Sequence, residues 1–382
     1  MSNSTKLIYK EFKTALNKLK IPDSWFWARY TLNPYSGCAH ACIYCDARSQ
    51  RYYLDQNFET EVIVKVNIDT ILDKKIRRSR TLKPDVVAAG GVNDAYQPAE
   101  LKEENTLKIL KILRFHNFPV NIATKSNLIT RDIELLDDIG KRSWCTVGFS
   151  ITTTNEELAS FLEPFSSSPV ERFKALKELK KKASNIQVGT YFMPIIPFLE
   201  DDEENMENVI KESKNAGADF VLFSPGLTLR DSQAEFFINK LKKSKYKDIV
   251  KPLLNLFNGK IYPPSHYSRK YHPILYELCK KFNLSVRVKR WIPKDFRKWN
   301  YKISELLLNK EYVESITKGI NNNKLKLAGR HLNNLPESII EVYRRGELSR
   351  LNSFTPEIID IVEDYIGKHK IQNQPSGLDR FI

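Results

Sequence analysis

The sequence lacks any run of eighteen apolar residues, so it offers no candidate for a membrane-spanning helix. Residues 1–6 lack the apolar core of a secretory signal and lead into a charged stretch that we expect to be helical. Five cysteines in 382 residues are too few, and odd in number, for a disulfide framework. We therefore expect a soluble cytoplasmic protein whose thiols stay reduced and are available to a metal.

Internal repeats are absent, and residues 321–323 form the only low-complexity run. Apolar residues make up 41% and charged residues 28% of the chain, which is ordinary for a globular protein and excludes wholesale disorder. A chain of this length accommodates one large catalytic domain and a smaller appendage.

Positive charge is concentrated in one part of the chain. The net charge is +15, and residues 240–301 carry 17 basic and 3 acidic side chains, a net of +14. Residues 302–382 have a net charge of +1, so the remaining residues are neutral as a group. One stretch of the sequence therefore holds almost the whole excess.

This basic stretch is also rich in aromatic residues. Basic groups neutralise phosphates and aromatic faces stack on unpaired bases, so the mixture suits contact with nucleic acid. The alternative is a solvated lysine-rich face over aromatics that belong to the core. The aromatic residues include Tyr246, Tyr262, Tyr267, Tyr271, Tyr276, Trp291, Phe296, Trp299 and Tyr301.

Short apolar runs rich in β-branched residues alternate with helical patterns through the middle of the sequence. This rhythm of β–α units is typical of a parallel sheet or barrel, so we predict an α/β fold. Strands are predicted at residues 30–33, 84–89, 120–123, 145–150, 187–192, 219–224 and 284–288. Helices are predicted at about residues 100–115, 130–140, 155–162, 169–183 and 203–215.

The helix at 169–183 has a clear start, with Ser168 as N-cap, Pro169 at the first helical position and Glu171 three residues after the cap. After residue 301 helical periodicity dominates. We therefore predict an N-terminal extension at 1–24, a core at 25–301 and a helical C-terminal appendage at 302–382. A helix-turn-helix around 325–351 fits the pattern, but the near-neutral charge of the appendage disfavours a DNA-reading role.

The strongest chemical signal is the cluster Cys38, Cys42 and Cys45, a C-x3-C-x2-C loop directly after a predicted strand. Spacings of three and two let one loop bring three thiolates to a single metal centre, and they favour an iron–sulfur cluster. Three thiolates leave one iron of a cubane without a protein ligand, which is an open position where a substrate can bind.

A zinc site is the alternative, with Cys145, Cys279 or His40 as the fourth ligand. Zinc sites more often pair two C-x2-C knuckles, and the sequence has no second knuckle. Cys145 and Cys279 lie in strand and helix patterns, where they are expected to be small core residues.

With this loop the sequence resembles the radical S-adenosylmethionine superfamily, and more narrowly it is similar to the spore photoproduct lyase-related branch. The resemblance covers about residues 30–225 and implies a partial (β/α)6 barrel with the active site at the carboxyl ends of the strands. Besides the cysteine loop, the matching stretches are Asn33-Pro-Tyr-Ser-Gly-Cys38, Tyr44-Cys45-Asp46-Ala47-Arg48, Asp94-Ala-Tyr-Gln-Pro-Ala-Glu100, Thr124-Lys-Ser126, Arg131-Asp132, Ser150-Ile-Thr-Thr153, Glu163-Pro164, Glu171-Arg172 and Met193-Pro-Ile-Ile-Pro197.

The resemblance implies a [4Fe–4S] cluster held by Cys38, Cys42 and Cys45, whose fourth iron chelates S-adenosyl-L-methionine. An external one-electron reductant such as flavodoxin or ferredoxin would drive cleavage to a 5′-deoxyadenosyl radical, which abstracts a hydrogen atom from the substrate.

Further residues receive cofactor-binding roles from the same resemblance. Gly90, Gly91 and Asn93 are expected at the methionyl amino group, Lys125 at the carboxylate, Ser150 at the ribose or carboxylate, and Tyr44 at the adenine. Each has an ordinary alternative: a strand-to-helix turn, a solvated cap, a helix start or packing against the loop. His40 is expected as a hydrogen-bonding neighbour of the cluster. Tyr96, Gln97 and Glu100 either line a substrate pocket or brace the second β–α loop.

One departure from the family pattern concerns the hydrogen donor. Photoproduct lyases carry a hydrogen-donating cysteine in the loop after the second strand, whereas Gly91 holds that position here and no cysteine lies between Cys45 and Cys145. Asp46 stands where those lyases have a tyrosine. We therefore expect a radical S-adenosylmethionine enzyme that repairs or modifies nucleic acid without splitting the spore photoproduct. The alternatives are a radical enzyme acting on a small molecule or peptide, and a non-catalytic zinc-dependent nucleic-acid binder.

Overall fold

The computed structural model describes residues 5–52, 57–58 and 60–369, which divide into two compact units. Within these ranges the first unit comprises Met1–Lys18 and Tyr30–Lys289, and the second comprises Leu19–Arg29 and Arg290–Ile382. The boundary predicted between residues 301 and 302 falls inside a helix, α11 (Arg297–Lys318).

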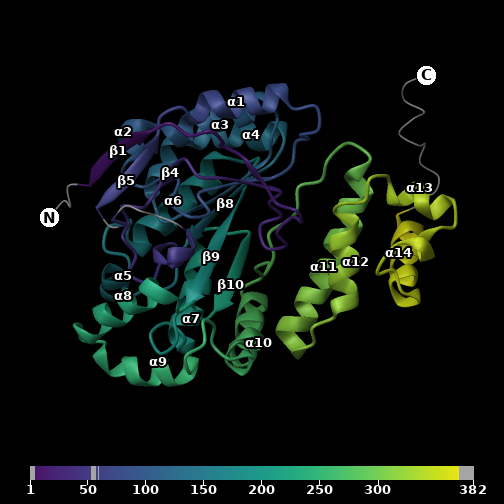
Figure 1. Ribbon diagram of the computed structural model, residues 1–382. Helices are drawn as coiled ribbons and strands as arrows, with labels where there is room; N and C mark the ends of the chain where they lie inside the picture. Colours follow the sequence, from purple (N-terminus) through teal and green to yellow (C-terminus); the bar gives the residue numbers. More distant parts are fainter. Residues whose placement is uncertain (1–4, 53–56, 59, 370–382) are drawn as a thin grey trace. The chain divides into compact units, whose positions relative to one another are not determined.

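The first unit is built on a seven-stranded sheet (Figure 1). Six strands run parallel and lie side by side in their chain order, and β2 joins the β3 edge antiparallel. Consecutive parallel strands joined by helices are the arrangement of a partial (β/α)6 barrel, so the predicted fold class is confirmed. The strands are β2 (Asn17–Lys18), β3 (Tyr30–Leu32), β6 (Val87–Ala89), β7 (Val120–Thr124), β8 (Cys145–Ser150), β9 (Gln187–Ile195) and β10 (Phe220–Pro225).

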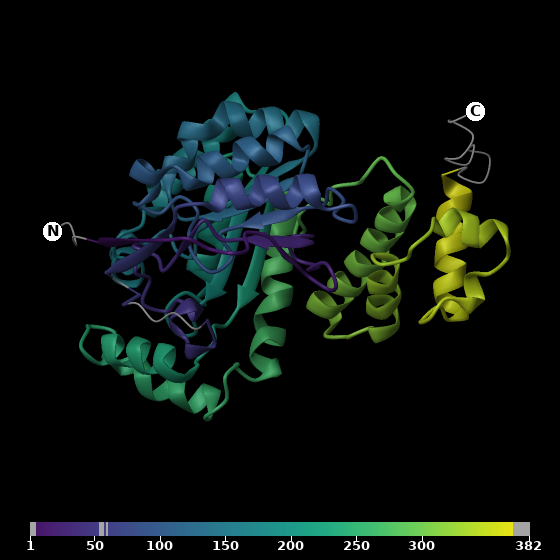
Figure 2. The same ribbon diagram turned by 45° about the horizontal axis from the view of Figure 1, so that its top comes forward.

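Helices connect the parallel strands and pack on the sheet or on one another. α8 and α9 lie at the end of the sheet toward which the arrows of β9 and β10 point (Figures 1 and 2). The helices of this part are α2 (Glu100–Glu103), α3 (Asn105–Phe115), η3 (Asn127–Asp132), α4 (Ile133–Arg142), α5 (Glu156–Leu162), α6 (Pro169–Lys182), α7 (Glu203–Asn215), α8 (Asp231–Lys242), η4 (Lys247–Ile249), α9 (Val250–Phe257) and α10 (Ser265–Lys281).

Local sequence signals account for several element ends. The capping box of α6 is confirmed, because Ser168 Oγ accepts from the Glu171 N–H and the Glu171 carboxylate accepts from the Ser168 N–H. The helix predicted at 100–115 is instead broken at Glu104, whose φ is +53°. The break arises because the Glu100 carboxylate accepts the Thr106 N–H at 2.8 Å and so caps the start of α3.

Two sequence predictions are wrong. Residues 284–288 do not form a strand, because Ser285 Oγ bonds the N–H and the carbonyl of Arg287 and turns the chain locally, leaving one bridge to Phe220. The expected N-terminal helix is the strand β1 (Lys6–Lys10), which pairs in parallel with β5 (Glu61–Lys65). β4 (Tyr35–Ser36) completes this second sheet, and α1 (Ile68–Arg78) follows it.

Two glycines let a large ring fill the centre of the main sheet. A Cβ atom at Gly148 would lie 2.1 Å from the ring of Tyr191, and one at Gly189 would lie 2.4 Å from the Phe220 carbonyl oxygen. Tyr191 is buried, and its hydroxyl accepts from Asn121 Nδ2 on β7 at 2.9 Å. Gly148 on β8 therefore makes room for the Tyr191 ring, and Gly189 on β9 lets Phe220 of β10 approach closely, as close packing requires.

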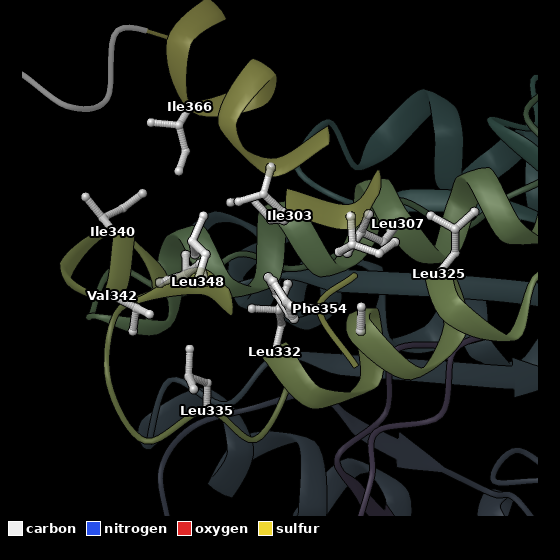
Figure 3. Close-up of a cluster of buried hydrophobic side chains, with 14 residues drawn as sticks. Ile303, Leu307, Leu325, Leu332, Leu335, Ile340, Val342, Leu348, Phe354 and Ile366 are labelled. Atoms are coloured by element: carbon white, nitrogen blue, oxygen red, sulfur yellow. The ribbon is translucent and has the colours of Figure 1, made fainter. Parts of the chain in front are cut away.

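The second unit is helical and has its own hydrophobic core (Figure 3). Its helices are α11, α12 (Asn323–Leu332), α13 (Ile339–Arg344), η5 (Leu348–Arg350) and α14 (Pro356–Lys368). Buried Arg290 donates to Asn333 Oδ1 and Ser304 Oγ, and Arg29 donates to the Asn333 carbonyl, which ties the Leu19–Arg29 segment to this unit. None of the helices in the described part of the chain combines the length and the apolar character that crossing a membrane requires.

Candidate active site

A cavity of about 200 Å3 opens where β6, β7 and β8 end. The loop that carries Cys38, Cys42 and Cys45 forms one wall. Residues 90–94 after β6, residues 123–125 at the end of β7 and Ser150 at the end of β8 complete the wall. Carboxyl ends of consecutive parallel strands meet at one edge of a sheet, so segments far apart in sequence converge there.

The cysteine loop is a series of tight turns. The N–H groups of Ala41, Cys45 and Arg48 donate to the carbonyls of Cys38, Cys42 and Cys45, respectively. Gly37 at φ +82° and Ala41 at φ +54° supply the left-handed backbone that such turning needs. All three cysteines remain thiols, and each lines the cavity.

Two side chains hold this loop, Gln97 from the loop after β6 and Arg48 from the residues just after Cys45. The Gln97 amide accepts from the Ala39 N–H at 2.9 Å and donates to the Gly37 carbonyl at 3.1 Å. Arg48 donates to the carbonyls of Ala41 and Cys42, and its guanidinium lies 3.9 Å from the ring centroid of Phe236. Gln97 therefore braces the cysteine loop, a role that differs from both predicted ones, the substrate pocket and the second β–α loop.

The donor set fits an iron–sulfur cluster. Burial raises the pKa of the Cys38 thiol to about 12 and also raises the pKa values of Cys42 and Cys45. A bound metal reverses this preference, because it stabilises thiolates and displaces their protons. In the described ranges no three His, Cys, Asp or Glu side chains converge on one ion position. A cubane has no such requirement, since each thiolate binds a different iron.

The loop after β6 offers an acceptor with no partner. Asn93 Nδ2 donates to the Tyr35 carbonyl at 2.5 Å, whereas the buried Asn93 Oδ1 accepts no hydrogen bond from any described group. Gly90 has φ +86°, and a Cβ atom there would lie 2.9 Å from the Asn93 carbonyl oxygen and the Ala95 nitrogen. A buried carbonyl oxygen beside the cavity suits an ammonium group, because burying it unsatisfied is costly. Gly91 also lines the cavity, and nothing lies within 4 Å of a Cβ atom built there.

Asp94 joins two walls of the cavity. Its carboxylate accepts from the Thr124 hydroxyl and from the Lys125 N–H, both at 2.7 Å. His40 Nδ1 lies 3.4 Å from Asp94 Oδ2, too poorly aligned for a hydrogen bond. Burial opposes ionisation of Asp94, but the nearby His40 and the two hydrogen bonds prevail and lower its pKa to about 2. His40 is thus a buried neighbour of the cysteines and lies against an anionic carboxylate.

A buried charge network lies behind the cavity. Arg172 forms an ion pair with Glu163 and donates to the Ser150 carbonyl at 2.7 Å. Lys125 Nζ lies 3.8 Å from Glu163 Oε1. Burial alone would neutralise Glu163, but Arg172 and then Lys125 lower the pKa of its carboxyl, and Glu163 in turn raises the pKa of Lys125. Lys125 therefore stays cationic at the cavity wall.

Tyr44 is the one predicted cofactor residue that the structure does not place on the cavity wall. Its hydroxyl donates to Glu163, and its ring packs with the apolar residues of α8 and α9. The side chain is turned away because the buried carboxylate of Glu163 needs a donor. Tyr96 and Glu100 are also occupied by hydrogen bonds within the protein. The Tyr96 hydroxyl donates to Asp132, and the Glu100 carboxylate accepts from Tyr35 and Arg131.

Asp46, next to Cys45, also lines the cavity and is partly exposed at its rim. Its carboxylate accepts from the Tyr52 hydroxyl at 2.8 Å, the Thr228 hydroxyl at 2.5 Å and Arg230 Nε at 3.1 Å. Burial raises the pKa of Tyr52 to about 12, and the Asp46 hydrogen bond adds to this effect. The rim thus depends on residues more than 180 positions away along the chain.

Several residues that shape the site received no role from the sequence. Glu163 and Arg172 both lie in stretches that match the family pattern, so the family resemblance could have indicated that they belong to the site. Arg48 also lies in such a stretch, whereas nothing in the sequence pointed to Arg230, because its contact with Asp46 depends on the folded chain.

The sequence matches one family model and is similar to proteins of other organisms. Residues 32–210 match the family model described as Radical SAM superfamily. An uncharacterised protein of Mycobacterium bovis is 30% identical over 278 residues, which span 72% of this chain and 80% of that protein. An uncharacterised protein of Methanocaldococcus jannaschii is 33% identical over 215 residues, which span 56% of this chain and 75% of that protein.

Solved structures of spore photoproduct lyase have a similar fold. A mutant of that enzyme superimposes with a TM-score of 0.53 at 18% identity, covering 72% of this chain and 79% of the other. A second mutant, described as having bound AdoMet and dinucleoside spore photoproduct, gives the same TM-score at 17% identity with the same coverage. At this level of identity the likeness establishes the fold.

Proposed function

This chain belongs to the radical S-adenosylmethionine superfamily and is a radical S-adenosylmethionine enzyme, and from this premise we propose that it acts on nucleic acid. In this proposal Cys38, Cys42 and Cys45 hold a [4Fe–4S] cluster. Bound together, the cluster and S-adenosylmethionine supply a 5′-deoxyadenosyl radical after one-electron reduction.

The observation that carries the cluster and cofactor part of the proposal is the convergence of three free thiols, an unpartnered Asn93 Oδ1 and a cationic Lys125 on one cavity. Asn93 Oδ1 would accept hydrogen bonds from the methionyl ammonium, and Lys125 would pair with the carboxylate. Gly90 leaves room for that end of the ligand to approach the backbone. Ser150, at the end of β8, would contact the ribose or the carboxylate.

The residues around these groups hold the loops of the site in place. Gln97 and Arg48 hold the cysteine loop, and the Glu163–Arg172 pair anchors the Ser150 carbonyl. The chain therefore contributes the positions of the groups that would hold the cofactors.

Two observations support nucleic acid as the substrate. Residues 240–301 carry most of the excess positive charge, and spore photoproduct lyase, a neighbour in fold, has been described with a dinucleoside photoproduct. The structure divides this basic stretch between the two units. Residues 240–289 belong to the first unit and residues 290–301 to the second. Nine of the eleven aromatic residues in this stretch are buried or half-buried, and only Tyr262 and Phe296 are exposed.

The reaction would differ from photoproduct splitting. Gly91 faces the cavity where the lyases carry a thiol donor, and in the described chain the only cysteines on the cavity wall are the three of the loop. The substrate radical must therefore be quenched without a dedicated protein thiol, which favours modification of a base or another type of repair.

Anaerobic reconstitution with iron and sulfide, followed by reduction and assay of 5′-deoxyadenosine, tests the chemistry. We expect a reducible cluster and S-adenosylmethionine cleavage in the wild type, and neither in Cys42→Ala, because two thiolates cannot hold a cluster with one open iron. Cys145→Ala is the matched control, since Cys145 is buried at the far end of β8 and should leave the cluster intact. Bound zinc without sulfide or deoxyadenosine would overturn the enzyme assignment.

A further inference from the structure

The α8–α9 lobe, residues 231–263, presents a dense array of lysines. Residues 240–260 contain seven lysines and a single acidic residue, Asp248, and all seven lysine side chains are exposed. Lys245 pairs with Glu157. The other six form no salt bridge with any residue that the structure describes: Lys240, Lys242, Lys243, Lys247, Lys251 and Lys260. Exposed lysines without acidic partners leave a field that attracts a polyanion.

The inner side of this lobe is fastened to the cysteine loop. Phe237, Leu241 and Leu253 share one buried cluster with Cys42 and Tyr44. Hydrogen bonds add to this packing: Gln233 Nε2 donates to the Tyr44 carbonyl at 3.0 Å, and Ser232 Oγ donates to the Arg48 carbonyl at 3.0 Å. Both views place α8 and α9 at the end of the sheet where the cavity opens (Figures 1 and 2). The helices that carry the lysines are therefore fastened to the cysteine loop.

An exposed aromatic ring connects the lobe to the cavity rim. Tyr262 is 58% exposed, yet its hydroxyl accepts from Arg230 Nη2 at 2.5 Å, and the Arg230 guanidinium carbon lies 5.2 Å from the ring centroid. Arg230 Nε in turn donates to Asp46, which lines the cavity. Two successive side-chain contacts thus lead from the cavity wall to a solvent-exposed ring.

The backbone under this ring is also fixed. The Leu229 N–H donates to the Ile261 carbonyl at 2.9 Å, and a Cβ atom at Gly226 would lie 2.6 Å from Pro263 Cγ. Residues 226–230 and 261–263 therefore run against each other. A large aromatic residue that stays exposed while its position is held by an arginine is preorganised to stack on a flat ligand.

We propose that the α8–α9 lobe binds single-stranded nucleic acid, with its lysines on the phosphates and Tyr262 stacked on an unpaired base at the cavity rim. This inference rests on the proposed function and adds the location and the strandedness of the substrate. In a duplex both faces of each base are covered by neighbouring bases, so a stacking platform selects unpaired nucleotides. Chemistry on a base inside an enclosed site likewise requires that the base leave the stack.

An acidic protein is the other polyanion that such a surface attracts, the electron donor included. Lysines alone do not separate the two partners, because they provide charge and little geometry. The exposed ring of Tyr262, two side-chain contacts from the cavity wall, favours nucleic acid, because an aromatic face stacks on an unpaired base. Docking of an acidic protein on this surface is a separate outcome of the test.

The test is binding of the reconstituted enzyme to fluorescein-labelled DNA of about 20 nucleotides, longer than the ~4–16 nucleotides that a single-strand-binding fold covers. The same sequence is offered as single-stranded DNA, as single-stranded RNA and as duplex DNA, under anaerobic conditions over a range of salt. Tyr262→Ala should weaken single-strand binding by about 5- to 150-fold and leave the duplex nearly unaffected. Tyr262→Phe keeps the ring and should retain most of the affinity.

Charge is tested by the triple variant Lys242→Glu, Lys243→Glu and Lys247→Glu. It should flatten the dependence of log K on log salt by about 0.7 for each phosphate that the lobe no longer neutralises. A triple variant with the same change in net charge on exposed positions of α6, Lys174→Glu, Lys177→Glu and Lys181→Glu, is the matched control and should change the slope much less.

Each result separates the two proposals. If wild-type enzyme makes deoxyadenosine and binds single strands, but lobe and Tyr262 variants bind as well as wild type, the lobe inference is wrong and the proposed function stands. If wild-type enzyme makes deoxyadenosine and binds no nucleic acid, both the lobe inference and the proposed substrate fail. If the lobe variant loses reduction by an acidic electron carrier but keeps nucleic-acid binding, the surface is a protein docking site and the inference is overturned.

Discussion

Replacing Arg172 by methionine removes the main partner of a buried carboxylate while roughly keeping the side-chain volume. Arg172 is 1% exposed and donates to Glu163, to Ser166 Oγ at 2.5 Å and to the carbonyls of Ser150 and Ser167 at 2.7 and 2.8 Å. Breaking a buried ion pair from one side costs about 3–5 kcal/mol, because the remaining charge is left uncompensated. We expect a loss of about 4 kcal/mol in the free energy of unfolding, since Lys125 and Tyr44 remain as partial partners of Glu163.

The pH dependence of this loss has a definite sign. In the wild type Arg172 and Lys125 lower the pKa of Glu163 below its ordinary value of 4.5, so this carboxylate stabilises the fold above pH 4.5 and loses its contribution as the pH falls. Without Arg172, burial dominates and raises the pKa of Glu163. The deficit of the variant should therefore be largest at neutral pH and shrink toward pH 4.5, where the carboxyl can take up a proton.

Hydrogen exchange of β8 and α6 amides in the reduced, metal-free protein measures this deficit within the first unit. Adding Glu163→Gln to Arg172→Met should recover at least about 1 kcal/mol, within the usual coupling energies of contacting pairs. A deficit below about 1 kcal/mol at neutral pH, or one of equal size under neutral and mildly acidic conditions, would refute the reasoning.

Three further predictions concern single positions. Gly90→Ala should destabilise the apoprotein by about 1–2 kcal/mol in urea unfolding, because its φ of +86° and its close backbone neighbours disfavour a side chain, whereas Gly91→Ala has open space and should be neutral; equal losses would contradict this. Burial beside Phe223 lowers the pKa of His272 to about 4, so stability should fall by about 2–3 kcal/mol between pH 6.5 and 4 as the unfolded chain takes up a proton, and His272→Gln should abolish that part of the dependence in a pH series of unfolding curves. Gln97→Leu leaves the Ala39 N–H unsatisfied and should cost about 1–3 kcal/mol; hydrogen exchange of peptides from residues 37–45 that stays at the wild-type rate would disprove the bracing role.

The open space at Gly91 bears on how the enzyme relates to its neighbours in fold. A Cβ atom there meets nothing within 4 Å, so the position can take a side chain without rearrangement. The missing thiol is therefore a property of the sequence and not a steric necessity of the cavity. In the proposed reaction, the substrate radical would then be quenched without a thiol at this position.

Local patterns in the sequence were sufficient for the core of the fold. The strand at 145–150, the helix at 203–215 and the capping box at Ser168 depend on contacts within a few residues, and the structure has them where they were predicted. The same is true of the cysteine loop, whose spacing alone places three thiols within one series of turns. The strand β1 was missed because its stability comes from pairing with β5, more than fifty residues away.

The tertiary structure decided which side chains surround the cysteines and which surface leads to them. Asp46 meets Arg230 across 184 positions, and Tyr44 turns toward Glu163 because a buried carboxylate needs a donor. The basic stretch at residues 240–301 is visible in the sequence, but only the fold assigns residues 240–289 and 290–301 to different units. The fold also leaves Tyr262 exposed and buries Tyr267 and Tyr271. The reason is physical: periodicity and spacing report contacts between near neighbours, whereas buried ion pairs and exposed platforms arise from residues that only the folded chain brings together.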